Sequence, residues 1–496
     1  MPGDPLRKGR LGDVRPPEVA EFLSSMEADR WIADADIFVD IAHLLMLSGR
    51  GIIDRGAARV IMAVLLELLE DGIPGEVFDD RYEDIHAGIE AHLIARAGAD
   101  YGGRIHMGRS RNDEVATCIR MRLREELLGQ MDALVRLRAL LIALADRHRE
   151  GIMPGFTHLQ HAQPTTLAHY FLAYEQAFGR DFDRIRDCFA RVDRCPLGAA
   201  AFASTGYPVD REQTATYLGF AAIAENTMDA VSARDFALEA MSASTLAMAT
   251  VSRMCEELVL WSSSFVDFVR LADPCCSTSS IMPQKKNPDT AEIMRAKAGT
   301  VSGSLVGALS IMKGLPMSYN RDMQELTPLL RRSVQETSRA LLLLAGMLET
   351  AVFNTERMAD EAGRGFSTAT EVADVLVRDF GLPFRTAHGI VGRAVRKGTL
   401  DLASLEDAAG EMEGISLIDR GLTEEGVAAA LDPGYGVAVR KAPGGPAPVA
   451  TAAAIVARRE QCSNDEAWMI MVRERIDTAQ AAMIDEARRL VASPEH

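Results

Sequence analysis

Apolar residues recur every three or four positions along most of this chain, which is the period of an α-helix with one buried face. In the first hundred residues three short segments show the pattern, Val19–Met26, Ala33–Leu47 and Ala57–Leu69. Glycine and proline separate these segments and mark the turns between them. We therefore expect a group of short helices at the start of the chain.

The middle of the chain carries much longer helical segments. Val115–His148 and Thr165–Arg194 contain one glycine each and no proline, Phe220–Asp273 contains neither residue, and Arg331–Ala345 repeats the helical pattern. Helices longer than about 25 residues are unusual in compact domains and predict a bundle. One chain can hardly cover so much apolar helix surface, so we expect several subunits to share the bundle.

From about Gly363 the helical segments become short again, and a charged amphipathic segment from Val449 to about Val491 follows. These changes predict a mostly α fold in three parts. The expected parts are an N-terminal helical domain (1–110), a central long-helix bundle carrying a polar loop (111–362) and a C-terminal helical domain (363–496).

The formal net charge of −17 argues against nucleic acid or an anionic membrane as a partner, because both require a basic face. An anionic substrate would need a local cluster of positive groups. No segment approaches the roughly 18 apolar residues of a membrane span, and the first residues resemble no secretion signal, so we expect a cytoplasmic protein. The seven cysteines are scattered without a C-x-x-C pair, which favours reduced thiols and no metal site.

A polar loop, Ser277–Asp289, interrupts the long helical segments. Its prolines oppose helix, and its hydroxyls, Lys285, Asn287 and backbone N–H groups could stabilise a negative charge that develops during a reaction. By composition alone, such a segment is more often an exposed connector.

Three further polar segments stand out. His106–Asp113 reads H-M-G-R-S-R-N-D, where Ser110 or Asn112 could simply cap a helix. Gly155–Pro164 contains two histidines, His158 and His161, and a histidine taken alone is more often structural than catalytic. Leu315–Glu325 reads L-P-M-S-Y-N-R-D-M-Q-E.

Together these segments resemble the signatures of argininosuccinate lyases in the fumarase/aspartase superfamily, whose loop is written S-S-x-M-P-x-K-x-N-P. The resemblance extends from Phe22 almost to the last residue. It implies the three-domain fold of that superfamily and a homotetramer whose sites form where three subunits meet. It also implies β-elimination of argininosuccinate to L-arginine and fumarate, a step of arginine biosynthesis, with no metal or organic cofactor.

The same resemblance assigns roles to individual residues. Ser279 is expected to abstract the proton and His158 to protonate the leaving nitrogen, although these roles could be exchanged. The expected substrate contacts are Ser25, Arg111, Asn112, Thr157, Lys285, Asn287, Tyr319 and Gln324. His86 matches a family segment but is given no chemical step.

The sequence departs from the family pattern at two positions. Thr278 stands where the family usually has glycine, and Leu326-Thr327-Pro328 lacks a substrate-binding lysine.

Two alternatives for the function stay open, another fumarate-releasing lyase such as adenylosuccinate lyase and a non-catalytic protein similar to delta-crystallin. The Gln284-Lys285-Lys286 sequence argues against the former, and the presence of Ser279 with His158 weakens the latter.

Overall fold

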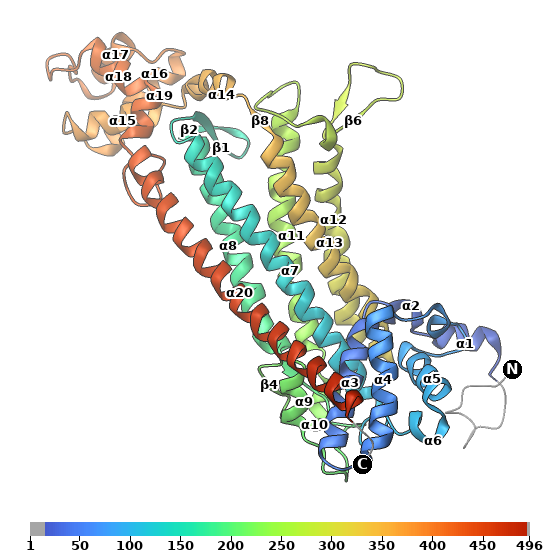
Figure 1. Ribbon diagram of the computed structural model, residues 1–496. Helices are drawn as coiled ribbons and strands as arrows, with labels where there is room; N and C mark the ends of the chain where they lie inside the picture. The colour runs from blue at the N-terminus through green and yellow to red at the C-terminus, as the bar shows by residue number, and fades with distance from the viewer. Residues whose placement is uncertain (1–14, 494–496) are drawn as a thin grey trace.

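The computed structural model describes residues 15–493, which form an elongated and mostly helical molecule (Figure 1). A group of short helices lies at one end of a long-helix bundle, and a smaller helical cluster lies at the other. The expected mostly α fold is confirmed. None of the helices in this part of the chain has both the length and the apolar character required to cross a membrane.

The N-terminal group consists of six short α-helices and one 3-10 turn. Their bounds are α1 Pro17–Leu23, α2 Met26–Asp29, α3 Ala33–Gly49, α4 Arg55–Asp71, η1 Gly75–Phe78, α5 Ile85–Ala97 and α6 Ala99–Gly102. Aspartates begin two of these helices, because the side chain of Asp54 accepts the N–H of Ala57 and that of Asp84 accepts the N–H of Ala87. The second cap matters for the site, since it fixes Asp84 at the start of α5.

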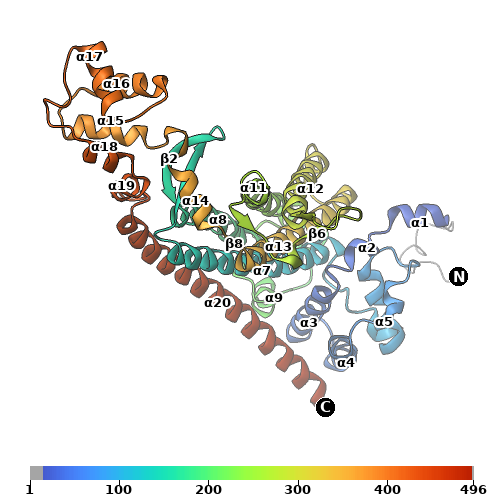
Figure 2. The same cartoon turned by 90° about the horizontal axis from the view of Figure 1, so that it is seen from above.

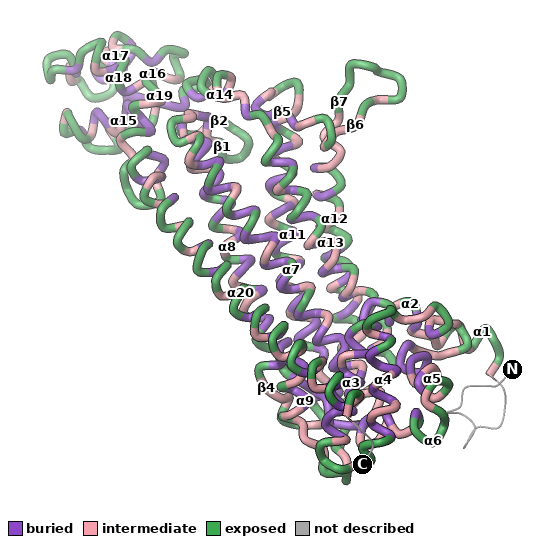
Figure 3. The backbone as a smooth tube through the Cα atoms, in the orientation of Figure 1, coloured by how far each residue is buried: buried purple, intermediate pink, exposed green. Residues whose placement is uncertain are grey.

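Long helices form the bundle, as the sequence predicts, although α12 and the part that α20 takes in it were not expected (Figures 1 and 2). They are α7 Arg111–Arg147, α8 Leu167–Val192, α11 Asp235–Ser262, α12 Asp289–Met312, α13 Leu326–Thr350 and α20 Pro448–Ala492. Ser110, one of the two candidate caps, begins α7 in a capping box with Asp113. Buried positions run along the inner sides of these helices (Figure 3).

One long helix is shorter than the sequence indicates. Within Phe220–Asp273 the chain first forms a strand and a short helix, and α11 begins only at Asp235. The side chain of Asn226 accepts the N–H groups of Met228 and Asp229 and so begins a separate short helix, α10 Thr227–Ser232. The absence of glycine and proline did not reveal these breaks, because a polar cap can begin a new helix. Conversely, α12 was not anticipated from its weak apolar pattern.

Small strands connect the long helices. The bounds are β1 Ile152–Thr157, β2 Gln160–Thr166, β3 Arg194–Cys195, β4 Ala222–Ile223, β5 Val269–Arg270, β6 Ser277–Thr278, β7 Lys286–Asn287 and β8 Val352–Phe353, with α9 Arg211–Tyr217 before β4. β1 with β2, β5 with β8 and β6 with β7 are antiparallel pairs, whereas β3 and β4 are parallel. The three antiparallel pairs lie at the end of the bundle far from the N-terminal helices (Figure 1).

The C-terminal cluster has a hydrophobic core of its own, which includes Leu376, Ile390 and Leu405. Its elements are α14 Thr355–Ala362, η4 Arg364–Phe366, α15 Ala369–Arg378, α16 Phe384–Lys397, α17 Leu402–Glu413, α18 Glu424–Leu431 and α19 Pro433–Ala438. The last helix, α20, leaves this cluster and packs along α7 and α8 as far as α3 and α4. The division into three domains stays a prediction, and α20 joins the last part to the first.

A buried ionic cluster holds α20 against the bundle. Arg138 of α7 donates to Oε1 of Glu175 on α8 at 3.0 Å and to Oδ2 of Asp465 on α20 at 2.6 Å. All three side chains are at most 3% exposed. Removing one member of such a cluster leaves another charge buried without a partner, which is strongly destabilising.

We therefore predict that Asp465→Ala lowers the free energy of unfolding by about 3 to 5 kcal/mol. The matched control on the same helix is Arg459→Ala, which removes an exposed ion pair with Asp146 and should cost less than about 1 kcal/mol. Urea unfolding followed by circular dichroism measures both. Equal effects of the two substitutions would contradict a structural role for the buried cluster.

Candidate active site

A polar cavity of about 370 Å³ lies at the N-terminal end of the bundle. It is bounded by α2, the segment before α5, the first turns of α7 and the segment that leads into α13. Its lining residues are Ser25, Asp29, Glu83, Asp84, His86, Arg111, Asn112, Val115, Ile119, Arg234, Tyr319, Arg321, Met323, Gln324 and Thr327. The structure thus brings together five residues that the sequence predicted as substrate contacts, namely Ser25, Arg111, Asn112, Tyr319 and Gln324.

The N-terminal segment is fastened to this cavity by short hydrogen bonds. Ser25 donates its hydroxyl to Oδ2 of Asp29 at 2.6 Å, and burial raises the pKa of Asp29 to about 6. The amide of Gln324 donates to the carbonyl oxygen of Leu23 at 3.1 Å. The contact of Gln324 with Leu23 joins two residues about 300 positions apart in the sequence, and both lie at the same wall of the cavity.

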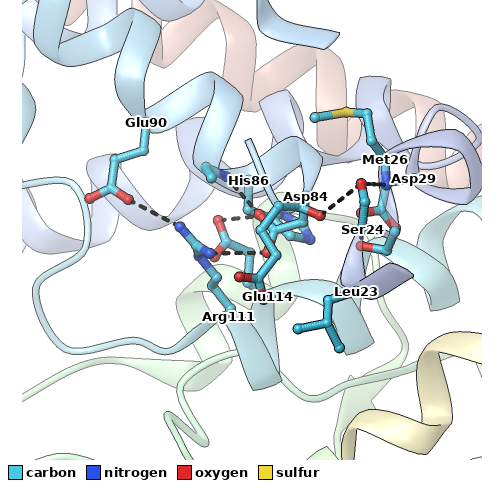
Figure 4. Close-up of polar contacts among 12 residues, drawn as sticks. Leu23, Ser24, Met26, Asp29, Asp84, His86, Glu90, Arg111 and Glu114 are labelled. Atoms are coloured by element: carbon cyan, nitrogen blue, oxygen red, sulfur yellow. Dashed lines mark hydrogen bonds and ion pairs between the residues drawn. The ribbon is translucent and has the colours of Figure 1, made fainter. Parts of the chain in front are cut away.

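Arg111 and Asn112 project from the first turn of α7. The guanidinium of Arg111 donates to Oδ2 of Asp84 at 3.0 Å and lies 3.7 Å from Oε2 of Glu90 (Figure 4). The amide of Asn112 donates to the carbonyl oxygen of Ala201 at 3.0 Å. Arg111 is therefore already neutralised by carboxylates, and Asn112 is held against the loop that follows β3.

Asp113 fixes that loop. Its Oδ2 accepts the backbone N–H groups of Gly198 at 2.9 Å and Ala200 at 2.7 Å, while its Oδ1 completes the capping box with Ser110. Burial raises the pKa of Asp113 to about 6. One carboxylate thus positions both the start of α7 and the loop opposite Asn112.

A buried ionic cluster underlies the cavity. His86 Nδ1 lies 2.8 Å from Oδ2 of Asp36 and 3.8 Å from Oε1 of Glu114. Arg109 bridges Oδ1 of Asp40 at 2.5 Å and Oε1 of Glu114 at 2.9 Å. All of these side chains are nearly inaccessible, so each charge depends on the others.

Burial by itself lowers the pKa of His86, but the charges of Asp36 and Glu114 outweigh burial and raise the pKa to about 10. Burial tends to raise the pKa of Asp36, yet the contact with His86 holds it below its usual range. His86 is therefore an imidazolium at neutral pH. Its Nε2 has no hydrogen-bond partner among residues 15–493, and the side chain lines the cavity.

Two groups in this cluster have donor atoms close enough to hold a metal ion. They are Asp36 with His86 and Cys118, and Asp36 with Asp40 and Glu114, whose ligand atoms all lie within 4.8 Å of one another. The imidazolium of His86 and the guanidinium of Arg109 already neutralise these carboxylates. The donor set is therefore better explained by its own internal cations than by a metal.

Thr157 and His158 lie at the other end of the bundle, in the hairpin of β1 and β2 (Figure 1). Thr157 pairs with Gln160, so His158 and Leu159 alone form the turn, with φ of 56° and 59°. Both values are left-handed, a conformation that costs side chains other than glycine about 1 kcal/mol or more each. The turn holds His158 at an exposed tip.

Ser279 begins the exposed loop between β6 and β7 (Figure 3). Its Oγ accepts the backbone N–H groups of Met282 at 3.0 Å and Ile281 at 3.3 Å. Thr278, the departure from the family pattern, pairs with Lys286 in extended conformation and does not need the freedom of glycine.

Two residues anchor this loop and one projects from it. Lys286 donates to Leu271 and Asp273, and the amide of Asn287 lies 3.4 Å from Oγ of Ser277. Among the described residues the ammonium of Lys285 has no hydrogen bond or ion pair. Lys285 is therefore available to an anion at the loop.

Within one chain, five predicted residues do not reach the cavity: Thr157, His158, Ser279, Lys285 and Asn287. α7 separates Arg111 from the β1–β2 hairpin, and its 37 residues correspond to roughly 55 Å. α12 similarly separates the Ser279 loop from Tyr319. The predicted residues therefore fall into two groups at opposite ends of the bundle.

Sequence reasoning missed several cavity residues. Arg321 lies inside the segment Leu315–Glu325, and Glu83 and Asp84 belong with His86 to the family segment Glu83-Asp84-Ile85-His86. Arg321 forms an ion pair with Glu83. Arg234 lies outside every motif. Nothing distinguishes this arginine within the helical segment expected over Phe220–Asp273, because the break before α11 is not evident from the sequence.

The ionic cluster predicts a pH dependence. Because the folded state raises the pKa of His86, its contribution to stability is complete below about pH 6.5 and is lost as pH rises through about 10. The stability difference between the wild type and His86→Gln should therefore shrink by about 1.4 kcal/mol per pH unit between these values. Urea unfolding at several pH values measures it, and a constant difference would exclude a protonated His86.

Comparison with known proteins identifies the family. A family model described as "Lyase" matches residues 9–303, and one described as "Argininosuccinate lyase C-terminal" matches residues 366–438. A curated argininosuccinate lyase from Methanoculleus marisnigri is 61% identical over 99% of this chain and 100% of its own length.

Solved structures agree with this result. An EDDS lyase crystallised with formate has a TM-score of 0.87 and 30% identity, with 97% of this chain and 96% of that chain covered. A class II fumarase from Schistosoma mansoni shares the fold, with a TM-score of 0.69, 17% identity and coverage of 82% of this chain and 90% of that chain. The chain belongs to the argininosuccinate lyase family of carbon–nitrogen lyases, within the fumarase/aspartase superfamily.

Proposed function

We propose that the protein splits argininosuccinate into L-arginine and fumarate, as a step of arginine biosynthesis. Support comes from relatives that are called argininosuccinate lyase. One of them is 61% identical over 99% of this chain. The observation that carries the proposal is the cavity, where five segments distant in the sequence meet and supply Arg111, Asn112 and Tyr319. Neither of the two alternatives is favoured by a comparable observation.

The reaction gives a role to the positive groups of the cavity, most of which are paired with neighbouring carboxylates. Removing the proton beside a carboxylate adds a third negative charge to a succinyl group that already carries two. Fixed positive groups and N–H donors lower the energy of such a carbanion more than water does, because they need no reorientation. Arg111, Arg234, Arg321 and His86 supply these charges in a protein whose total charge is −17.

Ser279 is proposed as the base. Two N–H groups already donate to its Oγ, at 3.0 and 3.3 Å, and such donors stabilise an oxygen that carries negative charge. Lys285 and Asn287 would add donors to the developing carbanion. His158 would protonate the leaving nitrogen, directly or through water.

We propose that the two halves of the site come from different subunits of a homotetramer. Large apolar side chains are exposed along the bundle although the long helices are otherwise well packed. They include Leu246, Ile293, Val306, Leu309, Leu342 and Leu343. A neighbouring copy packed antiparallel against these faces would cover them and carry its Ser279 loop and hairpin toward the cavity of the first copy.

The proposed setting is the cytoplasm, with argininosuccinate as the small-molecule partner and no organic cofactor. The reaction requires only proton transfers and electrostatic stabilisation, and protein side chains supply both.

The first test is direct. Purified protein mixed with argininosuccinate should release fumarate, followed by ultraviolet absorbance. Ser279→Ala and His158→Asn should each lower kcat by at least about 1,000-fold, because each removes a proton-transferring group. Both variants should keep the wild-type assembly state in size-exclusion chromatography.

Ser263→Ala is the matched control, since this half-buried serine lies near the same end of the bundle and, within residues 15–493, its hydroxyl bonds only to the carbonyl oxygen of Leu260. It should turn over normally. Release of fumarate from adenylosuccinate but not from argininosuccinate would favour the sister lyase, and no release from either would favour a crystallin-like protein. Near-normal activity of Ser279→Ala would overturn the role of that serine.

The shared site makes a second prediction. Ser279→Ala and Asn112→Ala each disable every site of their own assemblies. When the two variants are unfolded together and reassembled, some sites should receive an intact loop from one subunit and an intact cavity from another. Activity should then recover to a substantial fraction of the wild-type value. No recovery in tetramers shown to contain both chains would mean that each site is built within one subunit.

A further inference from the structure

Two of the seven cysteines differ from the rest in their position. Cys275 and Cys276 are half-buried and consecutive in the sequence, and they directly precede β6, the first strand of the hairpin that carries Ser279. All seven cysteines are free thiols. The other five are buried, namely Cys118, Cys188, Cys195, Cys255 and Cys462. The pair is therefore the only place in the chain where two adjacent thiols are partly accessible.

The pair forms the link between a short turn and the hairpin. Cys275 is the last residue of the 3-10 turn η2 Asp273–Cys275, and Cys276 follows in extended conformation with φ of −133°. The N–H of Cys276 donates to the carbonyl oxygen of Asp273 at 3.0 Å. The next residue, Ser277, already pairs with Asn287 in the hairpin. A change in the backbone of the pair is therefore passed directly to the first residue of β6.

The anchor of the loop depends on the same turn. The ammonium of Lys286 donates to the carbonyl oxygen of Leu271 at 2.7 Å and to Oδ1 of Asp273 at 2.6 Å. Sγ of Cys276 lies 4.0 Å from the same carbonyl oxygen, as a weak donor. The thiol and the ammonium thus share one acceptor, so a movement of Cys276 also disturbs the contacts of Lys286.

We propose that Cys275 and Cys276 are a site of reversible oxidation, at which a disulfide between them displaces the loop of Ser279 and stops turnover. The effect on turnover rests on the proposed function, whereas formation of the disulfide does not.

The oxidation requires a two-electron oxidant such as hydrogen peroxide. One thiolate attacks a peroxide oxygen, which gives a sulfenic acid and releases hydroxide. The second thiolate attacks the sulfenic sulfur, forms the S–S bond and releases a second hydroxide. The two protons lost from the thiols convert both hydroxides to water, so two thiols are oxidised and one peroxide is reduced to two molecules of water.

Covalent geometry explains why the disulfide displaces the loop. The Cα atoms of bridged cysteines usually lie about 4.4 to 6.8 Å apart. A peptide bond holds consecutive Cα atoms only about 3.8 Å apart. The ring can therefore close only if the backbone of the pair twists, and Asp273 and Ser277 on either side have to follow. Strain of this kind also makes a disulfide easy to reduce, so the change is reversible.

The test compares reduced and oxidised protein. Burial raises the pKa of the Cys276 thiol, so hydrogen peroxide is applied at about pH 8.5, where more of the thiolate is present. The mass of the chain should fall by two hydrogen atoms, the thiols titrated after denaturation should fall from seven to five, and peptide mapping should locate the bond at the pair. Turnover of argininosuccinate should fall by about 100-fold, because a misplacement of about 1 Å can cost that much. Dithiothreitol should restore it.

Substitutions separate the pair from other oxidation. Cys275→Ser and Cys276→Ser each leave one thiol of the pair, so both variants should turn over normally and keep their activity in peroxide. Cys255→Ala is the matched control, because it removes a buried thiol of α11 and should leave the sensitivity to peroxide unchanged. Should a serine variant fold poorly, alanine at the same position takes its place. Equal inactivation of the two single variants by peroxide would overturn the proposal.

Trypsin provides a measurement that does not depend on turnover. Cleavage after Lys285 and Lys286 should become faster in the oxidised protein, because the anchor of Lys286 is disturbed. Absence of the disulfide after peroxide treatment would overturn the proposal, and so would a mapped disulfide that leaves turnover unchanged. A protein that forms the bond and exposes Lys286 but never releases fumarate when reduced would refute the proposed function and leave the oxidation site established.

Discussion

The rigidity of the long helices is the constraint on which the rest of the structure depends. α7 begins with Arg111 and Asn112 in the cavity and ends just before the hairpin that carries His158. A continuous hydrogen-bonded helix cannot fold back, so its length of roughly 55 Å keeps the two groups apart. α12 acts in the same way between the Ser279 loop and Tyr319. One helix can therefore serve two sites, one at each end, if neighbouring copies run antiparallel.

The cavity shows how a strongly acidic protein can receive an anion. Beneath it, the carboxylates of Asp36 and Glu114 keep His86 protonated, and Arg109 is held by Asp40 and Glu114. Above it, Arg111 and Arg321 are balanced by their own carboxylates. The electrostatic field inside the cavity is thus set by charged groups a few ångströms apart. Water and salt screen the interactions of such groups poorly when the groups are buried. The total charge has little influence at that distance.

The two residues proposed for proton transfer are placed differently from the residues of the cavity. The cavity residues project from helices or from segments tied to helices, whereas His158 lies at the exposed tip of one hairpin and the half-buried Ser279 directly follows β6 in another. His158 is held in a left-handed turn that its side chain does not favour, and Ser279 sits in a loop that backbone N–H groups and the anchors at Lys286 and Asn287 stabilise. A rigid frame with movable reacting groups is consistent with loops that close over a bound substrate.

The sequence by itself determined most of the long helices, a cap at Ser110 or Asn112 and the polar loop, because helical period and capping are local properties, while the family resemblance named the candidate substrate contacts. It did not reveal the break before α11, the state of His86 or the loop held by Asp113. Those features depend on which segments meet, and the meeting residues are tens to hundreds of positions apart. Only the tertiary structure decided that the predicted site residues divide between two ends of the bundle, since spacing along a chain carries no information about the direction in which a rigid helix runs.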